Sequence, residues 1–257
     1  MTNTLRLLIS LLLCLSTATA QAAPASPELV VGYYDFPPEI YTDAEGFVHG
    51  PVIDLTRQVL KEAGYRAVYR QLASARLYRD LIEGNIDLWV GAAGKPGLVE
   101  HTLESRNILG QTRINLYFRP DTRPPRIPED LVGKELIVLG GYSYSQDLAA
   151  LFDNADMALQ LRRTGTHESA LQMLMHRRAD YVLGYQSPMQ EAVRKAGMDM
   201  LPHLALQDVP IRFIISRRSH DSLGLRDALD RAYERLSQDN QDIRLPLPSA
   251  RAAWPLP

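Results

Sequence analysis

Residues 141–145, Gly-Tyr-Ser-Tyr-Ser, combine a glycine with several hydroxyl groups at an expected strand-to-helix turn. The first N–H groups of a helix are unpaired, and with neighbouring hydroxyls they can bind a carboxylate or a phosphate. A serine at this turn can instead cap the helix, and both roles can hold at once. We therefore take Gly141, Tyr142 and Ser143 as candidate ligand-binding residues.

Two cationic side chains are candidates to pair with an anion in the same site. Arg76 lies in the first turn of an expected helix, next to Ser74, and Lys95 follows an expected strand. A guanidinium beside free helix N–H groups makes a good anion site. The alternative for Arg76 is a solvated surface position.

Four further candidates follow expected strands. Tyr34 and Phe36 come after the first strand, where aromatic faces can bind apolar bodies or cations. Ala92 and Tyr185 follow two others, and the hydroxyl of Tyr185 offers a neutral hydrogen bond. Packing in the core is the alternative for Phe36, and a loop facing solvent is the alternative for Tyr185.

The sequence lacks the residue patterns that metal binding, cysteine chemistry and acid–base catalysis require. The six histidines show no metal-ligand spacing, and the only cysteine is Cys14. Glu39, Glu100 and Glu168 could serve as acids, but none has a partner in a motif, and acid–base catalysis needs a positioned group. The sequence therefore predicts no catalytic residue, no metal site and no cofactor.

The chain begins with the pattern of a secretion signal. Arg6 precedes an apolar run at 7–15, and small residues at 18–20 offer a cleavage site. We expect a signal peptide at 1–20, with cleavage extending to 22 as a second option, and a mature protein in the periplasm that does not span a membrane. An uncleaved N-terminal anchor is the alternative.

Cys14 lies inside this signal, and Leu13 before it is too large for a lipid-modified cysteine, so we do not expect a lipoprotein. Because Arg6 is the one charged side chain among residues 1–20, the mature chain carries 27 basic and 30 acidic residues, a net charge of −3. Without a basic stripe, nucleic acid is not an expected partner.

Apolar runs alternate with helical patterns along the rest of the chain. Amphipathic spacing predicts helices over 52–63 and 74–83, with Ser74 as a cap, and a last helix over 223–236. Strands are expected between them, which indicates an α/β fold with a mostly parallel sheet. The expected strands are 29–31, 67–71, 86–90, 135–139, 159–161, 181–183 and 212–215.

The chain also divides into two similar series. The leucine, aspartate and glycine of 81–91 recur at the same relative positions in 174–184, which suggests two βαβ lobes or merely two similar helix–strand units. Pro-bearing connectors at 119–125 and 207–210 imply that the second lobe is inserted into the first. The expected division is lobe 1 at 28–119 plus 212–257, lobe 2 at 124–208, and a hinge at 119–124 and 208–212.

The sequence resembles the bacterial extracellular solute-binding proteins of family 3, the polar amino-acid-binding type. The resemblance covers nearly all of the mature chain, and it depends on the order and spacing of several short segments. It implies two Rossmann-like lobes joined by two crossovers, a periplasmic binding protein type II clamshell. The segments are Tyr34-Asp35-Phe36-Pro37-Pro38, 46–50, 53–55, 83–87, 131–134, 171–174 and 178–180.

The chain departs from this family where amino acids are bound. Members usually carry an arginine after the third strand of lobe 1, and here residues 94–100 contain none. They also carry an aspartate after the lobe 2 strand, where this chain has Tyr185, and hydroxyl residues where it has Ala92 and Ala93. We therefore expect weak binding of standard α-amino acids.

Taken together, these features predict a monomeric, non-enzymatic binding protein that captures a small polar or anionic solute by lobe closure. The resemblance implies an ABC importer as its partner. The alternative is a sensor component that signals to a membrane partner, and a dehydratase-like enzyme on the same fold is a third possibility.

Overall fold

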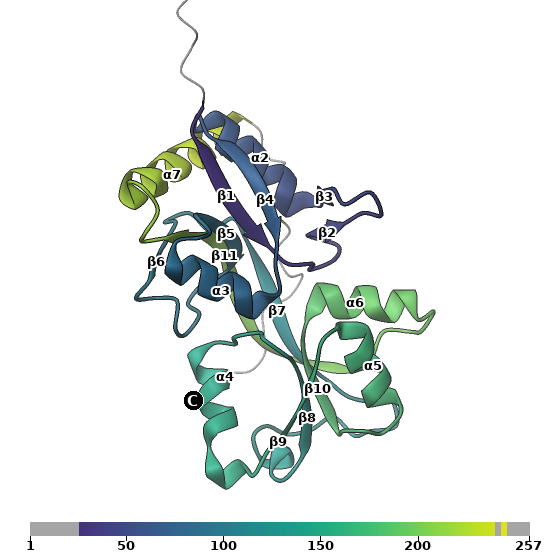
Figure 1. Cartoon of the computed structure of the whole chain (residues 1–257). Coiled ribbons are helices and arrows are strands. Elements are labelled where there is room, and N and C mark those ends of the chain that lie inside the picture. Colours follow the sequence, from purple (N-terminus) through teal and green to yellow (C-terminus); the bar gives the residue numbers. More distant parts are fainter. Residues whose placement is uncertain (1–25, 240–242, 246–257) are drawn as a thin grey trace, which may run out of the picture.

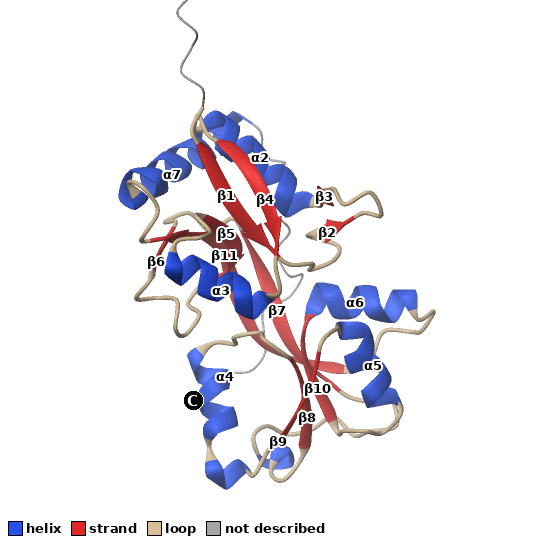
Figure 2. Cartoon of the chain, in the orientation of Figure 1, coloured by secondary structure: helices blue, strands red, loops and turns tan. Residues whose placement is uncertain are grey.

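The structure is a computed structural model that describes residues 26–239 and 243–245 (Figures 1 and 2). The expected signal peptide at 1–20 lies outside these residues. The strands are β1 (Glu28–Tyr33), β2 (Tyr41–Thr42), β3 (Val48–His49), β4 (Arg66–Gln71), β5 (Leu88–Ala92), β6 (Thr102–Glu104), β7 (Gly110–Tyr117), β8 (Glu135–Leu139), β9 (Gln160–Thr164), β10 (Tyr181–Tyr185) and β11 (His203–Ser216). The helices are α2 (Pro51–Glu62), α3 (Ser74–Glu83), α4 (Gln146–Asp153), α5 (His167–Met175), α6 (Gln186–Lys195) and α7 (Ser222–Asp239), with short 3-10 turns at Glu129–Leu131 and Ala155–Met157.

Within the described residues, one sheet of nine strands runs through the whole molecule in the order β4-β1-β5-β11-β7-β10-β8-β9, with β6 added beside β11. We call β4, β1, β5 and β6 with their helices the first half, and β10, β8 and β9 with theirs the second half. Each half has a parallel core, as the sequence predicts. This is the predicted α/β fold of two lobes.

The first half is covered on both faces, because every residue of β5 is buried and alternate side chains point to opposite sides. Leu88 and Val90 pack in the core formed with α2 and α7. Trp89 packs with α3 residues Leu77 and Leu81 on the other face. Figure 1 shows α2 and α7 together at one side of the sheet and α3 at the other.

The helix ends of the first half mostly follow the sequence. The helix α3 has the predicted bounds and ends at Gly84, whose φ of 82° suits a glycine. The prediction that Ser74 caps this helix is wrong, because Ala73 is the N-cap residue and makes no side-chain cap. Ser74 is the first helical residue and is buried.

The second half repeats the scheme with β8 and β10 at its centre. Leu136, Val138 and Leu183 pack on the side that includes α4, whereas Ile137 and Val182 pack on the side of α5 and α6. Two of its helices begin with a side-chain cap. Ser145 accepts a hydrogen bond from the Leu148 N–H, and Thr166 accepts one from the Ser169 N–H.

The strands β7 and β11 connect the two halves. They pair antiparallel from His203 opposite Tyr117 to Ile211 opposite Gly110, with a bulge after Ala205. From Ile211 on, β11 pairs with β5 in the first half. Residues 114–117 of β7 pair along their other edge with β10 in the second half. Both halves therefore belong to one continuous sheet.

The predicted irregular connector at 207–210 is wrong, because β11 runs through it from residue 203. Pro210 is tolerated where β11 passes from one partner to the next, since pairing with β5 begins only at Ile211. The carbonyl of Pro210 accepts a hydrogen bond from the Ala93 N–H. Among the described residues, no helix is both long and apolar enough to cross a membrane.

Candidate ligand-binding site

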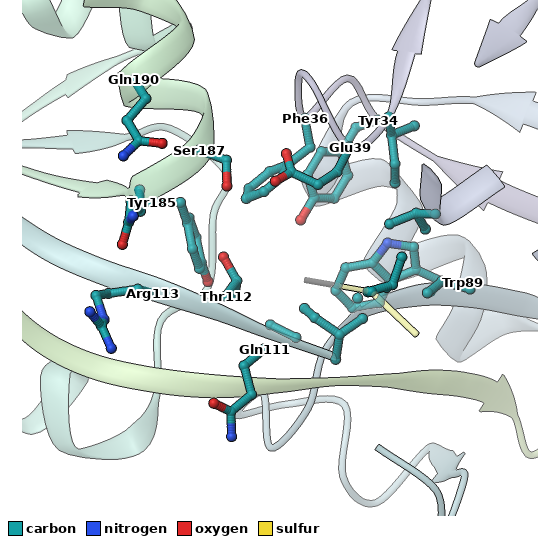
Figure 3. Close-up of a pocket in the computed structure, with 18 residues that line it drawn as sticks. Tyr34, Phe36, Glu39, Trp89, Gln111, Thr112, Arg113, Tyr185, Ser187 and Gln190 are labelled. Carbon is teal, nitrogen blue, oxygen red and sulfur yellow. The ribbon is translucent and has the colours of Figure 1, made fainter. Parts of the chain in front are cut away.

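A cavity of about 290 Å³ lies between the two halves (Figure 3). Its walls come from the turn after β1, from β5, from the start of α6 and from the crossing strands β7 and β11. This volume is at the small end of the range of about 300–1,000 Å³ typical of ligand pockets. The lining residues are Tyr34, Phe36, Glu39, Ile40, Val52, Trp89, Val90, Gly91, Ala92, Gln111, Thr112, Arg113, Tyr185, Gln186, Ser187, Gln190, Ile211 and Leu245.

The turn after β1 places Phe36 and Glu39 at the cavity. Backbone hydrogen bonds join Phe36 N–H to the Ile40 carbonyl at 2.7 Å and Ile40 N–H to the Phe36 carbonyl at 3.0 Å. The chain then passes closely beside Gly50, where an added Cβ would lie 2.2 Å from the Glu39 carbonyl oxygen. Gly50 therefore allows this turn to pack against the start of α2.

The Glu39 side chain is partly buried, and its Oε2 is buried without a hydrogen-bond partner among the described residues. Burial raises the pKa of this carboxyl above its ordinary value, and the Ser187 hydroxyl lowers it in part. Figure 3 shows Glu39 and Ser187 on opposite sides of the cavity, pointing toward one another. Glu39 is thus a hydrogen-bond acceptor with spare capacity.

Aromatic rings from both halves meet beside the cavity. Tyr34 lies 5.4 Å from Tyr142 between ring centroids, and Phe36 lies 5.3 Å from Tyr185. Tyr142 and Tyr185 are 5.8 Å apart, and Tyr34 lies 6.0 Å from Trp89. Edge and tilted contacts at these distances are favourable. The rings therefore join the halves where they face one another.

The position of the Trp89 ring depends on Gly91, two residues further along β5. A Cβ added to Gly91 would lie 1.9 Å from Trp89 Cζ2, so the indole ring covers the Gly91 backbone. The missing side chain at 91 creates the space that the ring fills, and the ring in turn forms one cavity wall.

Lys95 reaches from the first half to the second. It is 4% exposed, and its Nζ donates a hydrogen bond to the Ser143 carbonyl oxygen. The same ammonium lies 5.5 Å from the Tyr78 ring centroid and 5.9 Å from that of Trp89. Burial lowers the pKa of Lys95 to about 7.

The crossing strands supply a buried ion pair to the cavity wall. Arg113 Nε donates to Asp208 Oδ1 at 2.6 Å, and Arg113 Nη2 donates to Asp208 Oδ2 at 2.9 Å. This two-bond geometry matches the planar guanidinium to the carboxylate. Next to it, the Thr112 hydroxyl is buried without a hydrogen-bond partner in the described part of the chain.

The structure brings together most of the residues that the sequence singles out. Tyr34, Phe36, Ala92 and Tyr185 line the cavity. Tyr142, Ser143 and Lys95 form the contact between the halves beside it. These positions lie at the ends of four strands or in the turns that follow them, and Ala92 and Tyr185 are the last residues of β5 and β10.

Gly141 and Arg76 lie elsewhere. Gly141 packs against the start of α3, where an added Cβ would lie 2.9 Å from Ser74 Oγ. Arg76 is exposed, lies outside the cavity lining and pairs with Asp80 at 3.5 Å. No three His, Cys, Asp or Glu side chains of the described residues are grouped so that they could hold a metal ion.

Sequence reasoning missed Trp89, Thr112, Arg113 and Ser187 as cavity residues, and it treated Glu39 only as an available acid. Trp89 and Arg113 lie inside strands, where sequence patterns indicate packing. No local signal identifies Arg113, because Gln111, Thr112 and Asn115 also make this strand polar.

Comparison with known proteins supports the fold. No family model matches the chain, and no curated protein matches its sequence. Among solved structures, a histidine kinase sensor domain with similarity to periplasmic binding proteins superposes with a TM-score of 0.71 at 19% identity, covering 85% of this chain and 94% of its own. An ancestral arginine-binding protein bound to arginine has a TM-score of 0.69 at 20% identity, with 85% and 97% covered.

The holo form of ArgBP from T. maritima is a third similar structure, with a TM-score of 0.65 at 19% identity, covering 82% of this chain and 90% of its own. Identities this low establish the architecture and leave the ligand open. The chain has the mixed α/β fold of periplasmic binding proteins.

Proposed function

We propose that this protein is a non-enzymatic solute-binding protein that captures a small molecule by closing two lobes around it. The observation that carries the proposal is the cavity at the junction of the halves, lined by Phe36 and Glu39 from one half and by Tyr185 and Ser187 from the other. A ligand held there would contact both halves, and such contacts favour the closed form.

The crossing strands are the natural place for bending. Residues 119–124 are tied to the second half, because Arg119 Nη1 donates to the Ala179 carbonyl at 3.0 Å and Asp121 pairs with Arg177. We therefore propose bending at 208–212 together with the paired residues 110–113, in place of 119–124. Lobe 1 would then be 28–109 with 213–239 and 243–245, and lobe 2 would be 114–207.

The finer parts of the proposal follow from the sequence. The signal at 1–20 supports a monomeric protein in the periplasm, and the resemblance to amino-acid-binding proteins supports an ABC importer as partner. A role in sensing is supported by the similarity to the histidine kinase sensor domain. Neighbouring genes for a permease and an ATPase would favour transport, and a gene for a membrane receptor would favour sensing.

The test is a thermal-shift screen of the exported protein against small acids, amines, peptides and sugars. A solute that binds only the folded state raises the melting temperature. Small-angle scattering with that solute should show compaction if an open form is present without it. A protein whose melting temperature responds to no member of the screen would contradict the proposal.

A further inference from the structure

The shape and walls of the cavity define what fits there. Its aromatic side chains, Tyr34, Phe36, Trp89 and Tyr185, surround a small space. Aromatic faces favour apolar groups and cations, and the effect of a cation is larger where water is excluded. A compact ligand with an apolar body fits these walls.

The charges around the cavity do not cancel. Among the described lining residues, Glu39 has the one carboxyl side chain and Arg113 the one basic side chain. Arg113 is already neutralised by two hydrogen bonds to Asp208. One carboxyl group therefore remains without a cation, and a cation bound beside it would favour its charged form.

The unpartnered polar atoms fit the same kind of ligand. Glu39 Oε2 and Thr112 Oγ1 both lack hydrogen-bond partners among the described residues, and both belong to cavity residues. Ser187 and Gln190 add further acceptors on the opposite wall. An ammonium group carries three donors and no acceptor, so it can use several such oxygens at once.

Among the described lining residues, a ligand carboxylate finds hydrogen-bond donors but no cation without a counter-charge. The charge of Arg113 is balanced by Asp208, and Lys95 donates to the Ser143 carbonyl, outside the lining. The exposed Arg76 lies outside the lining as well. The carboxylate of a zwitterion would therefore meet no unbalanced positive charge on this wall.

We propose that this cavity binds a compact organic cation, an amine with an apolar body and no carboxylate, with Glu39 as the group that receives the ammonium. This inference rests on the proposed solute-binding function and specifies its ligand class. It differs from the small polar or anionic solute that the sequence predicts, because the cationic candidates Arg76 and Lys95 lie outside the cavity lining.

The test uses four probes with one phenyl-alkyl skeleton: phenethylamine, 2-phenylethanol, 3-phenylpropionate and phenylalanine. Calorimetry with the exported protein should show phenethylamine binding about tenfold or more tightly than 2-phenylethanol, since a hydrogen bond to a charged group is worth about a decade of affinity. The propionate and phenylalanine should bind more weakly than the amine.

Substitutions test which residue causes the preference for the amine over the alcohol. Glu39→Gln should make the amine and the alcohol bind equally, whereas Glu45→Gln, in the exposed turn after β2, should leave the preference unchanged. Thr112→Val keeps the shape of that side chain and should reduce amine affinity severalfold, which provides a second test that does not alter Glu39.

Equal or tighter binding of the propionate or of phenylalanine would overturn the cation assignment. So would a preference for the amine that survives Glu39→Gln, or no binding of phenethylamine. If another solute of the thermal-shift screen binds in that case, the solute-binding function stands and only its ligand class is wrong. If no solute binds, both proposals fail.

Discussion

Lys95 is buried between the halves, and its replacement tests whether they are closed in solution. Its ordinary pKa of 10.5 falls to about 7 because burial disfavours the charged form. Between these two values the unfolded chain holds one proton more than the folded protein, so stability rises with pH across that window. Below about pH 7 both states hold the proton, and the cost of burying the charge is largest there.

The size of this effect follows from the shift. One pKa unit corresponds to about 1.4 kcal/mol, so the full window from pH 7 to 10.5 amounts to about 5 kcal/mol. The Lys95→Met variant lacks this proton. Relative to the variant, the natural protein should therefore gain about 3 kcal/mol in free energy of unfolding between pH 7 and pH 9.5. The lost bond to Ser143 shifts the variant by an amount that does not depend on pH.

Urea denaturation of both proteins at several pH values measures this difference, and other titrating groups cancel in the comparison. Lys134→Met is the matched control, because Lys134 is exposed and should give curves parallel to the natural protein. Parallel curves for Lys95→Met as well would refute the reasoning. They would show that Lys95 is solvated, as it would be if the halves stood apart.

Three further changes have defined outcomes. Gly91→Ala places a Cβ 1.9 Å from the Trp89 ring, so we expect a loss of about 1–3 kcal/mol in unfolding free energy and an altered tryptophan emission spectrum. Arg113→Met leaves the Asp208 carboxylate without its two-bond partner and should cost about 3–5 kcal/mol in urea denaturation, whereas Asp208→Leu combined with it should recover part of that loss. His167 is buried and its pKa falls to about 4, so stability should decrease by about 2–3 kcal/mol as the pH drops from 6.5 to 4.5, and His167→Phe should lack this decrease.

The parts of the fold that depend on local patterns are predictable from the sequence. The strand β8 and the helix α3 have the bounds that the sequence predicts. In β8, apolar residues cluster because both faces of a central parallel strand are covered. In α3, spacing and a terminal glycine set both the face and the end.

The crossing strands are where local patterns fail. The sequence predicts no strand at β7, and it predicts only the last few residues of β11. Their ladder joins residues about 90 positions apart, and it includes Arg113, Asp208 and Pro210, which locally resemble a loop. Long-range pairing overrides local preference here, because Arg113 and Asp208 form an ion pair across the two strands.

The candidate site also contains residues that the sequence identifies and residues that only the structure identifies. Turns at the ends of strands are visible in the sequence, so Tyr34, Phe36 and Tyr185 are found from it. Trp89 is not, because a large apolar residue in a strand usually packs in the core. Its role depends on Gly91 two positions later, and only the structure shows the ring lying over that backbone.

Two departures from the amino-acid-binding pattern, Tyr185 and Lys95, both lie in the contact between the halves. Tyr185 stands where an ammonium-binding aspartate is expected, and its ring packs against Phe36 and Tyr142. Burial raises the pKa of this phenol, so it offers a neutral group in place of an anion. Lys95 follows β5, after which an arginine is expected, and it is held by the Ser143 carbonyl. At both positions where the resemblance places an ionic partner of an amino acid, this chain has a contact that joins the halves. Among the described residues that line the adjoining cavity, Glu39 keeps a carboxyl oxygen without a hydrogen-bond partner.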